Sequence, residues 1–264
     1  MSAFVALEDG GMAAIYRNVL LFIVLAGCVS RAFAAPVTVA VAANMQFTFD
    51  ELQRAYSREL GGTVKGIVNS SGALTAQITN AAPFDVFLSA DTDYPAQLQK
   101  DGFAAAAPRV YAYGTLVLWT TRALNLTHWR LLLTNPEIKK IAVANPKIAP
   151  YGREAINVLN YYKLHDAVAN KLVFGTSISQ TNQYIESGSV DVGITAKSVV
   201  LSPQLVGKGT WIALPSESYT PIAQAAVLIQ RRKFSVSNEA QQFYDFLFGA
   251  TARDILQRAG YGLP

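Results

Sequence analysis

One short stretch decides how this chain folds: Val68-Asn69-Ser70-Ser71-Gly72, a polar turn between an apolar, strand-like segment (64–68) and a helical pattern (73–81). A helix start leaves backbone N–H groups without intrahelical acceptors, and a serine hydroxyl adds another donor. The turn therefore suits an anion. The alternative is that Ser70 or Ser71 only caps the helix, as serine commonly does.

The same order of strand, polar turn and helix recurs at three more places. These turns are Ala43-Asn44, Pro150-Tyr151 and Ser177-Ile178. Strand-like runs alternate with helical patterns through the chain, at 37–43, 64–68, 84–90, 140–144, 171–174 and 191–195. This alternation predicts an α/β fold of two halves, each a mixed, mostly parallel sheet flanked by helices.

The two halves have no flexible linker between them, so we expect extended strands to connect them. The run 113–119 reads as one long strand and 222–229 as another. We place the crossings near Leu116 and near Ala225. The expected division is 35–116 with 225–264 as lobe I, and 117–224 as lobe II.

The four turns predict the chemistry of the ligand. Ligands of open α/β sheets lie outside the carboxyl ends of strands, where helices begin. Each helix start carries roughly half a positive charge, so four sum to about two and match a dianion. None of the four turns carries an acid or a base. Donors without an acceptor favour a fully deprotonated anion such as molybdate, tungstate or sulfate over hydrogen phosphate. The alternative for each turn alone is a cap at Asn44 or Ser177 and a core side chain at Tyr151.

Composition excludes several classes of protein. The chain has 264 residues, of which 51% are hydrophobic and 15% charged, so it can form a globular core. Its net charge is +4, but the basic residues are scattered, and we expect no nucleic-acid binding. Two histidines and one cysteine give no metal-ligand set and no Cys/His nucleophile pair, so we expect neither a cofactor nor an enzyme.

The first 34 residues read as a signal peptide. Arg17 precedes a short apolar run (19–26), and Ala32-Phe33-Ala34 offers small residues at the cleavage spacing. We expect cleavage after Ala34 and a periplasmic protein. Cys28 in a lipoprotein-like sequence is the alternative anchor, and Met12 is an alternative start.

Several motifs together resemble the periplasmic molybdate-binding proteins of ABC transporters. They are Val39-Ala40-Val41-Ala42-Ala43-Asn44-Met45, Asn69-Ser70-Ser71-Gly72 with Gln77-Ile78, and the segments 82–91, 145–152 and 260–264. The resemblance implies a type II binding protein whose two lobes are linked by two strands. It would act as a monomer that delivers molybdate, or tungstate, to a membrane permease.

The resemblance also implies the ligand contacts. They are Asn44, Ser71 through hydroxyl and backbone, Tyr151 and the backbone of Ile178, with Ala43, Ser70 and Ser177 as possible additions. One branch of the family uses a tyrosine where this chain has Ala196, and the other uses one at the position of Tyr151. Ala43 lacks the hydroxyl that the family sometimes offers there.

Three other functions stay open at this point. The first is a sulfate or thiosulfate receptor of the same fold. The second is a hydrolase with Ser71 as nucleophile, although the turn lacks the Gly-x-Ser-x-Gly spacing. The third is a receptor for an organic acid, which would need an arginine for the carboxylate. Arg153 is the only arginine near a turn.

Overall fold

The computed structural model describes residues 36–230 and 235–264. The expected signal peptide (1–34), with the alternatives at Met12 and Cys28, lies outside the described residues. The part of the chain that is described contains no helix long and apolar enough to cross a bilayer.

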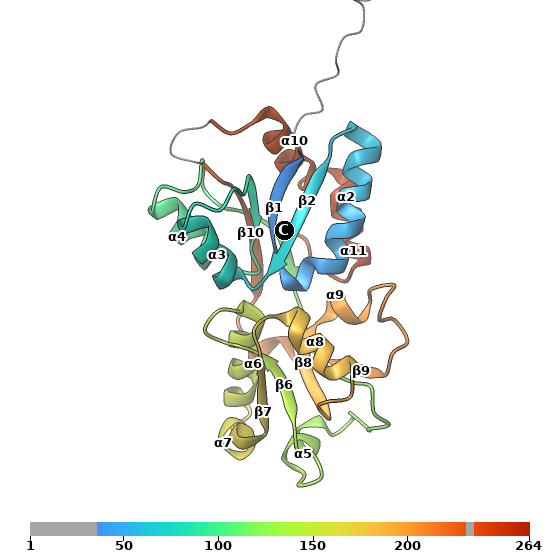
Figure 1. Cartoon of the computed structure of the whole chain (residues 1–264). Helices are drawn as coiled ribbons and strands as arrows, with labels where there is room; N and C mark the ends of the chain where they lie inside the picture. Colours follow the sequence, from blue (N-terminus) through green and yellow to red (C-terminus); the bar gives the residue numbers. More distant parts are fainter. Residues whose placement is uncertain (1–35, 231–234) are drawn as a thin grey trace, which may run out of the picture. The chain divides into compact units, whose positions relative to one another are not determined.

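The first sheet is built from the beginning and the end of the described chain (Figure 1). Its order is β2-β1-β3-β10-β4. The strands are β1 (Val37–Ala42), β2 (Val64–Asn69), β3 (Val86–Leu88), β4 (Arg109–Gly114) and β10 (Ile222–Leu228). Small and β-branched residues fill β1, which is buried between β2 and β3.

Helices cover both faces of this sheet (Figure 1). On one face lie α2 (Gln46–Leu60), α10 (Asn238–Phe246) and α11 (Ala250–Arg258), and on the other α3 (Ser71–Thr79) and α4 (Asp93–Lys100). The 3-10 helix η1 (Ala43–Met45) leads into α2. Gly61 ends α2 in the left-handed conformation, with φ of 68°, which favours glycine. We call this sheet and its helices the first lobe.

The second sheet has the order β7-β6-β8-β5-β9. Its strands are β5 (Leu116–Thr120), β6 (Ile141–Ala144), β7 (Leu172–Gly175), β8 (Val192–Ala196) and β9 (Thr210–Ala213). The helices around it are α5 (Trp129–Thr134), α6 (Pro150–Tyr161), α7 (His165–Val168), α8 (Ile178–Glu186) and α9 (Lys197–Val200), with short 3-10 turns η2 (Ala169–Lys171) and η3 (Ser216–Ser218). We call this sheet and its helices the second lobe.

The two-lobed α/β fold with mixed sheets is confirmed, with one correction. Parallel pairs do not predominate: β1 pairs parallel with β2 and β3, and β6 with β7 and β8, while β10 and β5 pair antiparallel with both of their neighbours. Strands β5 and β10 each follow a crossing between the sheets, and each runs opposite to both of its neighbours.

The sequence prediction placed the crossings near Leu116 and near Ala225, and the second of these differs from the structure. The run 113–119 is not one strand, because the chain leaves the first sheet after Gly114 and enters the second at Leu116. The return lies between Ala213 and Ile222, so residues 222–224 pair with β4 in the first sheet instead of belonging to the second lobe. An apolar run gives no local sign of such a change of sheet.

Candidate functional site

The four predicted turns meet at one small cavity. Its lining comes from both lobes: Ala42, Ala43, Asn44, Ser70, Ser71, Ala90, Ala149, Pro150, Tyr151 and Ile178. The cavity volume is about 10 Å³, which is room for about one water-sized sphere. A cavity this small excludes organic solutes of ordinary ligand size, which occupy pockets of about 300–1,000 Å³.

The start of α3 brings two serine hydroxyls to the cavity. Ser70 is the N-cap residue, yet its side chain makes no capping hydrogen bond. Among the described side chains, its Oγ is the one buried polar atom without a partner. The Oγ of Ser71 accepts a hydrogen bond from the backbone N–H of Ala90 at 3.0 Å. Because that bond uses a lone pair, the Ser71 proton is free for a ligand.

The starts of α6 and α8 supply backbone donors. Pro150 is the first residue of α6 and has no N–H, so Tyr151 carries the first backbone donor of that helix. Ile178 is the first residue of α8. Ser177 is a helix cap, which was the alternative role considered for it. Its Oγ caps α8 by accepting from the N–H of Gln180, and the residue does not line the cavity.

The side chains of Asn44 and Tyr151 both form hydrogen bonds with Gln224. The Nδ2 of Asn44 donates to Oε1 of Gln224 at 2.7 Å and to the hydroxyl of Tyr261 at 3.1 Å. The hydroxyl of Tyr151 accepts from Nε2 of Gln224 at 3.4 Å. Both Nδ2 protons of Asn44 are used, so its contribution to the cavity is the backbone N–H at a helix start. Tyr151 can offer its backbone N–H and also its hydroxyl proton, because the bond from Gln224 uses only a lone pair.

Burial keeps the tyrosines of this region protonated. Desolvation raises the pKa of Tyr151 and of Tyr111 well above 10, and nearby tyrosine hydroxyls act in the same direction. Desolvation also raises the pKa of Tyr261 to about 12, against hydrogen bonds that lower it. These hydroxyls are neutral at physiological pH, so no phenolate repels an anion.

Sequence reasoning missed Gln224, Tyr111 and Tyr261, which surround the base of the site. Gln224 is fully buried in β10. One signal was available: Gln224 is the single polar side chain in the otherwise apolar run 222–229. A polar residue in a buried strand needs hydrogen-bond partners, which hints at a network.

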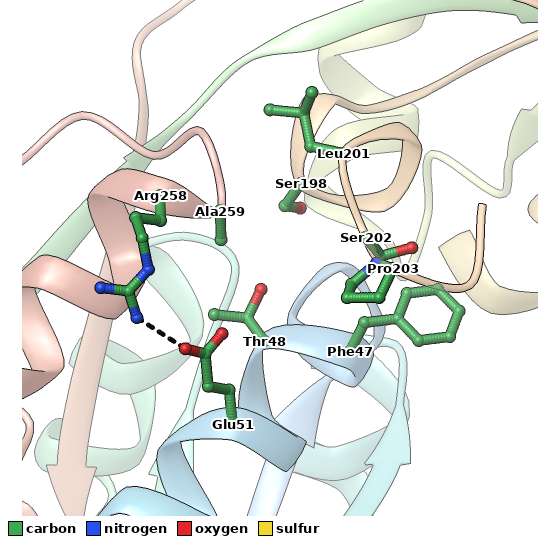
Figure 2. Close-up of a pocket in the computed structure, with 9 residues that line it drawn as sticks. All are labelled: Phe47, Thr48, Glu51, Ser198, Leu201, Ser202, Pro203, Arg258 and Ala259. Carbon is green, nitrogen blue, oxygen red and sulfur yellow. Dashed lines mark hydrogen bonds and ion pairs between the residues drawn. The ribbon is translucent and has the colours of Figure 1, made fainter. Parts of the chain in front are cut away.

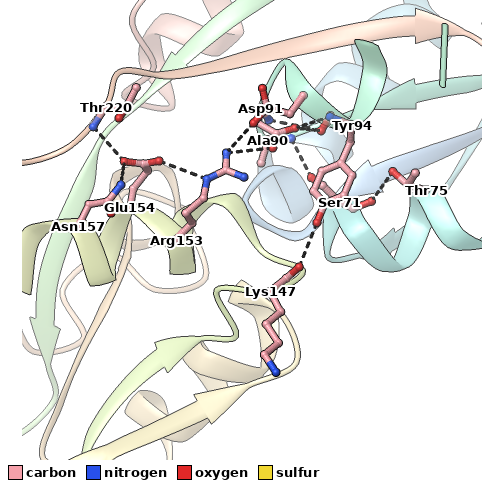
Figure 3. A network of polar contacts seen from close by, with 12 residues as sticks. Ser71, Thr75, Ala90, Asp91, Tyr94, Lys147, Arg153, Glu154, Asn157 and Thr220 are labelled. Atoms are coloured by element: carbon pink, nitrogen blue, oxygen red, sulfur yellow. Dashed lines mark hydrogen bonds and ion pairs between the residues drawn. The ribbon is translucent and has the colours of Figure 1, made fainter. Parts of the chain in front are cut away.

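Polar contacts join the two lobes beside the cavity, and Figure 3 shows those of Tyr94 and Arg153. The N–H of Gly72 donates to the carbonyl oxygen of Ile148 at 2.9 Å, and the hydroxyl of Tyr94 donates to that of Lys147 at 3.3 Å. Arg153 of α6 reaches Asp91 at 3.2 Å and Asp93 at 3.3 Å. These bonds hold the lobes together beside the cavity.

Arg153 does not enter the cavity. Besides its bonds to the first lobe it pairs with Glu154, so its charge is compensated by carboxylates. Burial is the main cause that raises the pKa of Asp91, although Ser89, Tyr94 and Arg153 stabilise its ionised form. An arginine engaged in this way does not supply the carboxylate clamp that an organic-acid receptor needs.

No charged side chain is among the residues that line the cavity. The described residues also contain no group of three or more His, Cys, Asp or Glu side chains that could hold a metal ion. Neither His128 nor His165 lines the cavity with Ser71, so a serine–histidine pair is not formed there. The arrangement can bind a small anion by hydrogen bonds and helix dipoles.

A second pocket of about 190 Å³ lies between α2, α9 and α11 (Figure 2). It contains the ion pair of Arg258 with Glu51 at 2.6 Å. A site that holds a carboxylate suits a small dianion less well than the neutral cavity does.

Comparisons with known proteins show the family of this chain. Residues 37–262 match the family model described as bacterial extracellular solute-binding protein, and this chain belongs to that family. It is 36% identical over 231 residues to the molybdate-binding protein ModA of Azotobacter vinelandii, covering 87% of this chain and 91% of the relative. It is 34% identical to ModA of Rhodobacter capsulatus, covering 89% and 91%.

A solved structure is similar over the same region. The periplasmic molybdate-binding protein of Azotobacter vinelandii superposes with a TM-score of 0.81 and 32% identity, covering 86% of this chain and 99% of that one. The likeness extends through both lobes, as the type II binding-protein fold requires.

Proposed function

We propose that this protein captures molybdate, and tungstate, in the cavity between the lobes and delivers it to an ABC permease. The observation that carries the proposal is the convergence of four helix starts on a cavity of about 10 Å³ with no charged lining residue. The relatives named as molybdate-binding proteins support the choice of anion.

Neutral donors from both lobes would hold the anion. The backbone N–H groups of Asn44, Ser71, Tyr151 and Ile178 lie at helix starts, and the hydroxyls of Ser70 and Ser71 add two more donors. Four helix dipoles supply about two positive charges. No carboxylate or imidazole lines the cavity to accept the proton of hydrogen phosphate, so the site favours a fully deprotonated dianion.

Sulfate is the competing ligand, because it is also a dianion without a proton at neutral pH. The two anions differ in size, so a rigid ring of donors can prefer one of them. A thermal-shift panel of molybdate, tungstate, sulfate, phosphate and chromate on the purified mature protein separates them.

We expect molybdate and tungstate to raise the melting temperature most. A ligand at 100 times its Kd stabilises the native state by about 2.7 kcal/mol. A larger shift with sulfate than with molybdate would identify a sulfate receptor. No shift with any of the five anions would refute the proposed site.

Export and partner complete the proposal. We infer cleavage after Ala34, a periplasmic monomer without enzymatic activity, and transfer of the anion to a membrane permease. Mass spectrometry of the mature protein tests the N-terminus. A first residue of Ala35 supports cleavage after Ala34. A lipidated Cys28 as the first residue would contradict it and indicate a membrane-anchored lipoprotein.

A further inference from the structure

Gln224 joins both sides of the candidate site beneath the cavity. Its Oε1 accepts from Nδ2 of Asn44 at 2.7 Å and from the hydroxyl of Tyr111 at 3.2 Å. Its Nε2 donates to the hydroxyl of Tyr151 at 3.4 Å. Asn44 lies just before α2 in the first lobe, and Tyr151 lies at the start of α6 in the second. One side chain therefore connects two of the four helix starts.

A β-bulge between β10 and β4 orients these side chains toward each other. The register of β10 with β4 shifts at Gln224, which pairs with Ala112, while Ala225 pairs with Val110. Tyr111 is the extra residue of this bulge, and bulges commonly redirect a side chain. The Tyr111 hydroxyl has one proton, which it shares between Oε1 of Gln224 and the carbonyl oxygen of Ser89, 3.1 Å away.

Gly114 makes room for the contact on the other side. A Cβ at this position would overlap the Tyr151 hydroxyl and lie 3.1 Å from Nε2 of Gln224. Gly114 is the last residue of β4, directly before the chain crosses to the second sheet. The network thus lies at the crossing strands, where the distance between the lobes is determined.

Every polar atom of the Gln224 amide is engaged and the side chain is fully buried. Satisfied polar networks in a low-dielectric interior are rigid, because breaking one bond leaves an expensive unpaired group. The spacing of Asn44 and Tyr151 is therefore fixed by a side chain that does not itself line the cavity.

We propose that Gln224 is a specificity-determining positioning residue: it sets the separation of the helix starts at Asn44 and Tyr151, and so the size of anion that the cavity accepts. This inference rests on the proposed function. Loosening the spacing weakens the preference for molybdate over the smaller sulfate, since the donors no longer hold one radius.

The test is the ratio of sulfate Kd to molybdate Kd, measured by titration calorimetry with sulfate as competitor where it binds weakly. Gln224→Met keeps the length of the side chain and removes its hydrogen bonds. We expect the ratio to fall at least tenfold. Tyr151→Phe removes one of the same bonds from the other end and should lower the ratio in the same direction, and the double variant should add little to Gln224→Met.

Thr195→Val is the matched control. The Thr195 hydroxyl is fully buried and donates to Asn182 Oδ1 at 2.5 Å, and neither residue lines the cavity. This variant should lower the melting temperature without changing the ratio. A purely structural role for Gln224 would give the same pattern as the control.

The outcomes separate two failures. A parent protein that binds no molybdate refutes the proposed function and this inference together. A parent that binds molybdate, with a ratio within twofold of its value in Gln224→Met, refutes only the inference. If Gln224→Met does not fold, an unchanged ratio in Tyr151→Phe has the same meaning.

Discussion

Replacing Ser71 by alanine is the most direct perturbation of the candidate site. The Ser71 side chain is 1% exposed and lines the cavity at the first residue of α3. Its Oγ accepts from the N–H of Ala90, so its proton remains for the anion. Ser71→Ala removes this donor and leaves the backbone donors of the four helix starts in place.

The magnitude follows from the charge of the ligand. A hydrogen bond to a charged group contributes about 1.5–3 kcal/mol, which corresponds to a loss of about ten- to a hundredfold in molybdate affinity. The buried N–H of Ala90 also loses its acceptor, and an unsatisfied buried donor costs about 1–3 kcal/mol of folding stability. The melting temperature without ligand should therefore fall as well.

The assay is titration calorimetry with molybdate, together with melting curves without ligand. Thr75→Val is the control, because the Thr75 hydroxyl is buried in the same helix and donates to the carbonyl oxygen of Ser71 at 2.9 Å without lining the cavity. It should lose stability and keep its affinity. Ser71→Ala binding within twofold of the parent, or an equal affinity loss in Thr75→Val, would refute the assignment of this hydroxyl to the anion.

Three further predictions concern the same region. Ser70→Ala should leave the melting temperature without ligand nearly unchanged, because its Oγ has no partner, and should weaken molybdate binding about tenfold; a clear loss of stability would show an unrecognised partner. Gly114→Ala should cost about 1–3 kcal/mol of stability by overpacking against Tyr151, and urea unfolding that matches the parent would contradict this contact. The free energy of unfolding should fall as pH rises above about 10, because burial raises the pKa of Tyr111, Tyr151 and Tyr261, which stay protonated in the folded state and ionise in the unfolded chain. The loss is up to about 1.4 kcal/mol per tyrosine and pH unit. A flatter decline in Tyr261→Phe would show that these tyrosines cause the loss.

The local part of the site could be predicted from the sequence. Strand, polar turn and helix are short-range signals, so they indicated Asn44, Ser71, Tyr151 and Ile178, and these residues do line one cavity. The same signals could not separate binding from capping. Ser70 makes no capping bond while Ser177 does, and that difference depends on how each hydroxyl meets its own helix.

The long-range part could not be predicted. Gln224 meets Asn44 across 180 positions of sequence, and no local pattern encodes such a pair. The return crossing was placed too late for a similar reason, because the apolar run 222–229 does not itself show which of the two sheets it joins. Which groups of Tyr151 are available to a ligand also depends on the tertiary contacts of its hydroxyl.

The segment after α11 has a practical consequence for anyone handling this protein. Tyr261 reaches inward from it, and its hydroxyl donates to the carbonyl oxygen of Asn44 at 3.0 Å and lies 2.9 Å from Oγ of Ser198 in the second lobe. Removing the residues after α11, or straining them with a fused purification tag, would therefore disturb the surroundings of Asn44, which lies far away in sequence.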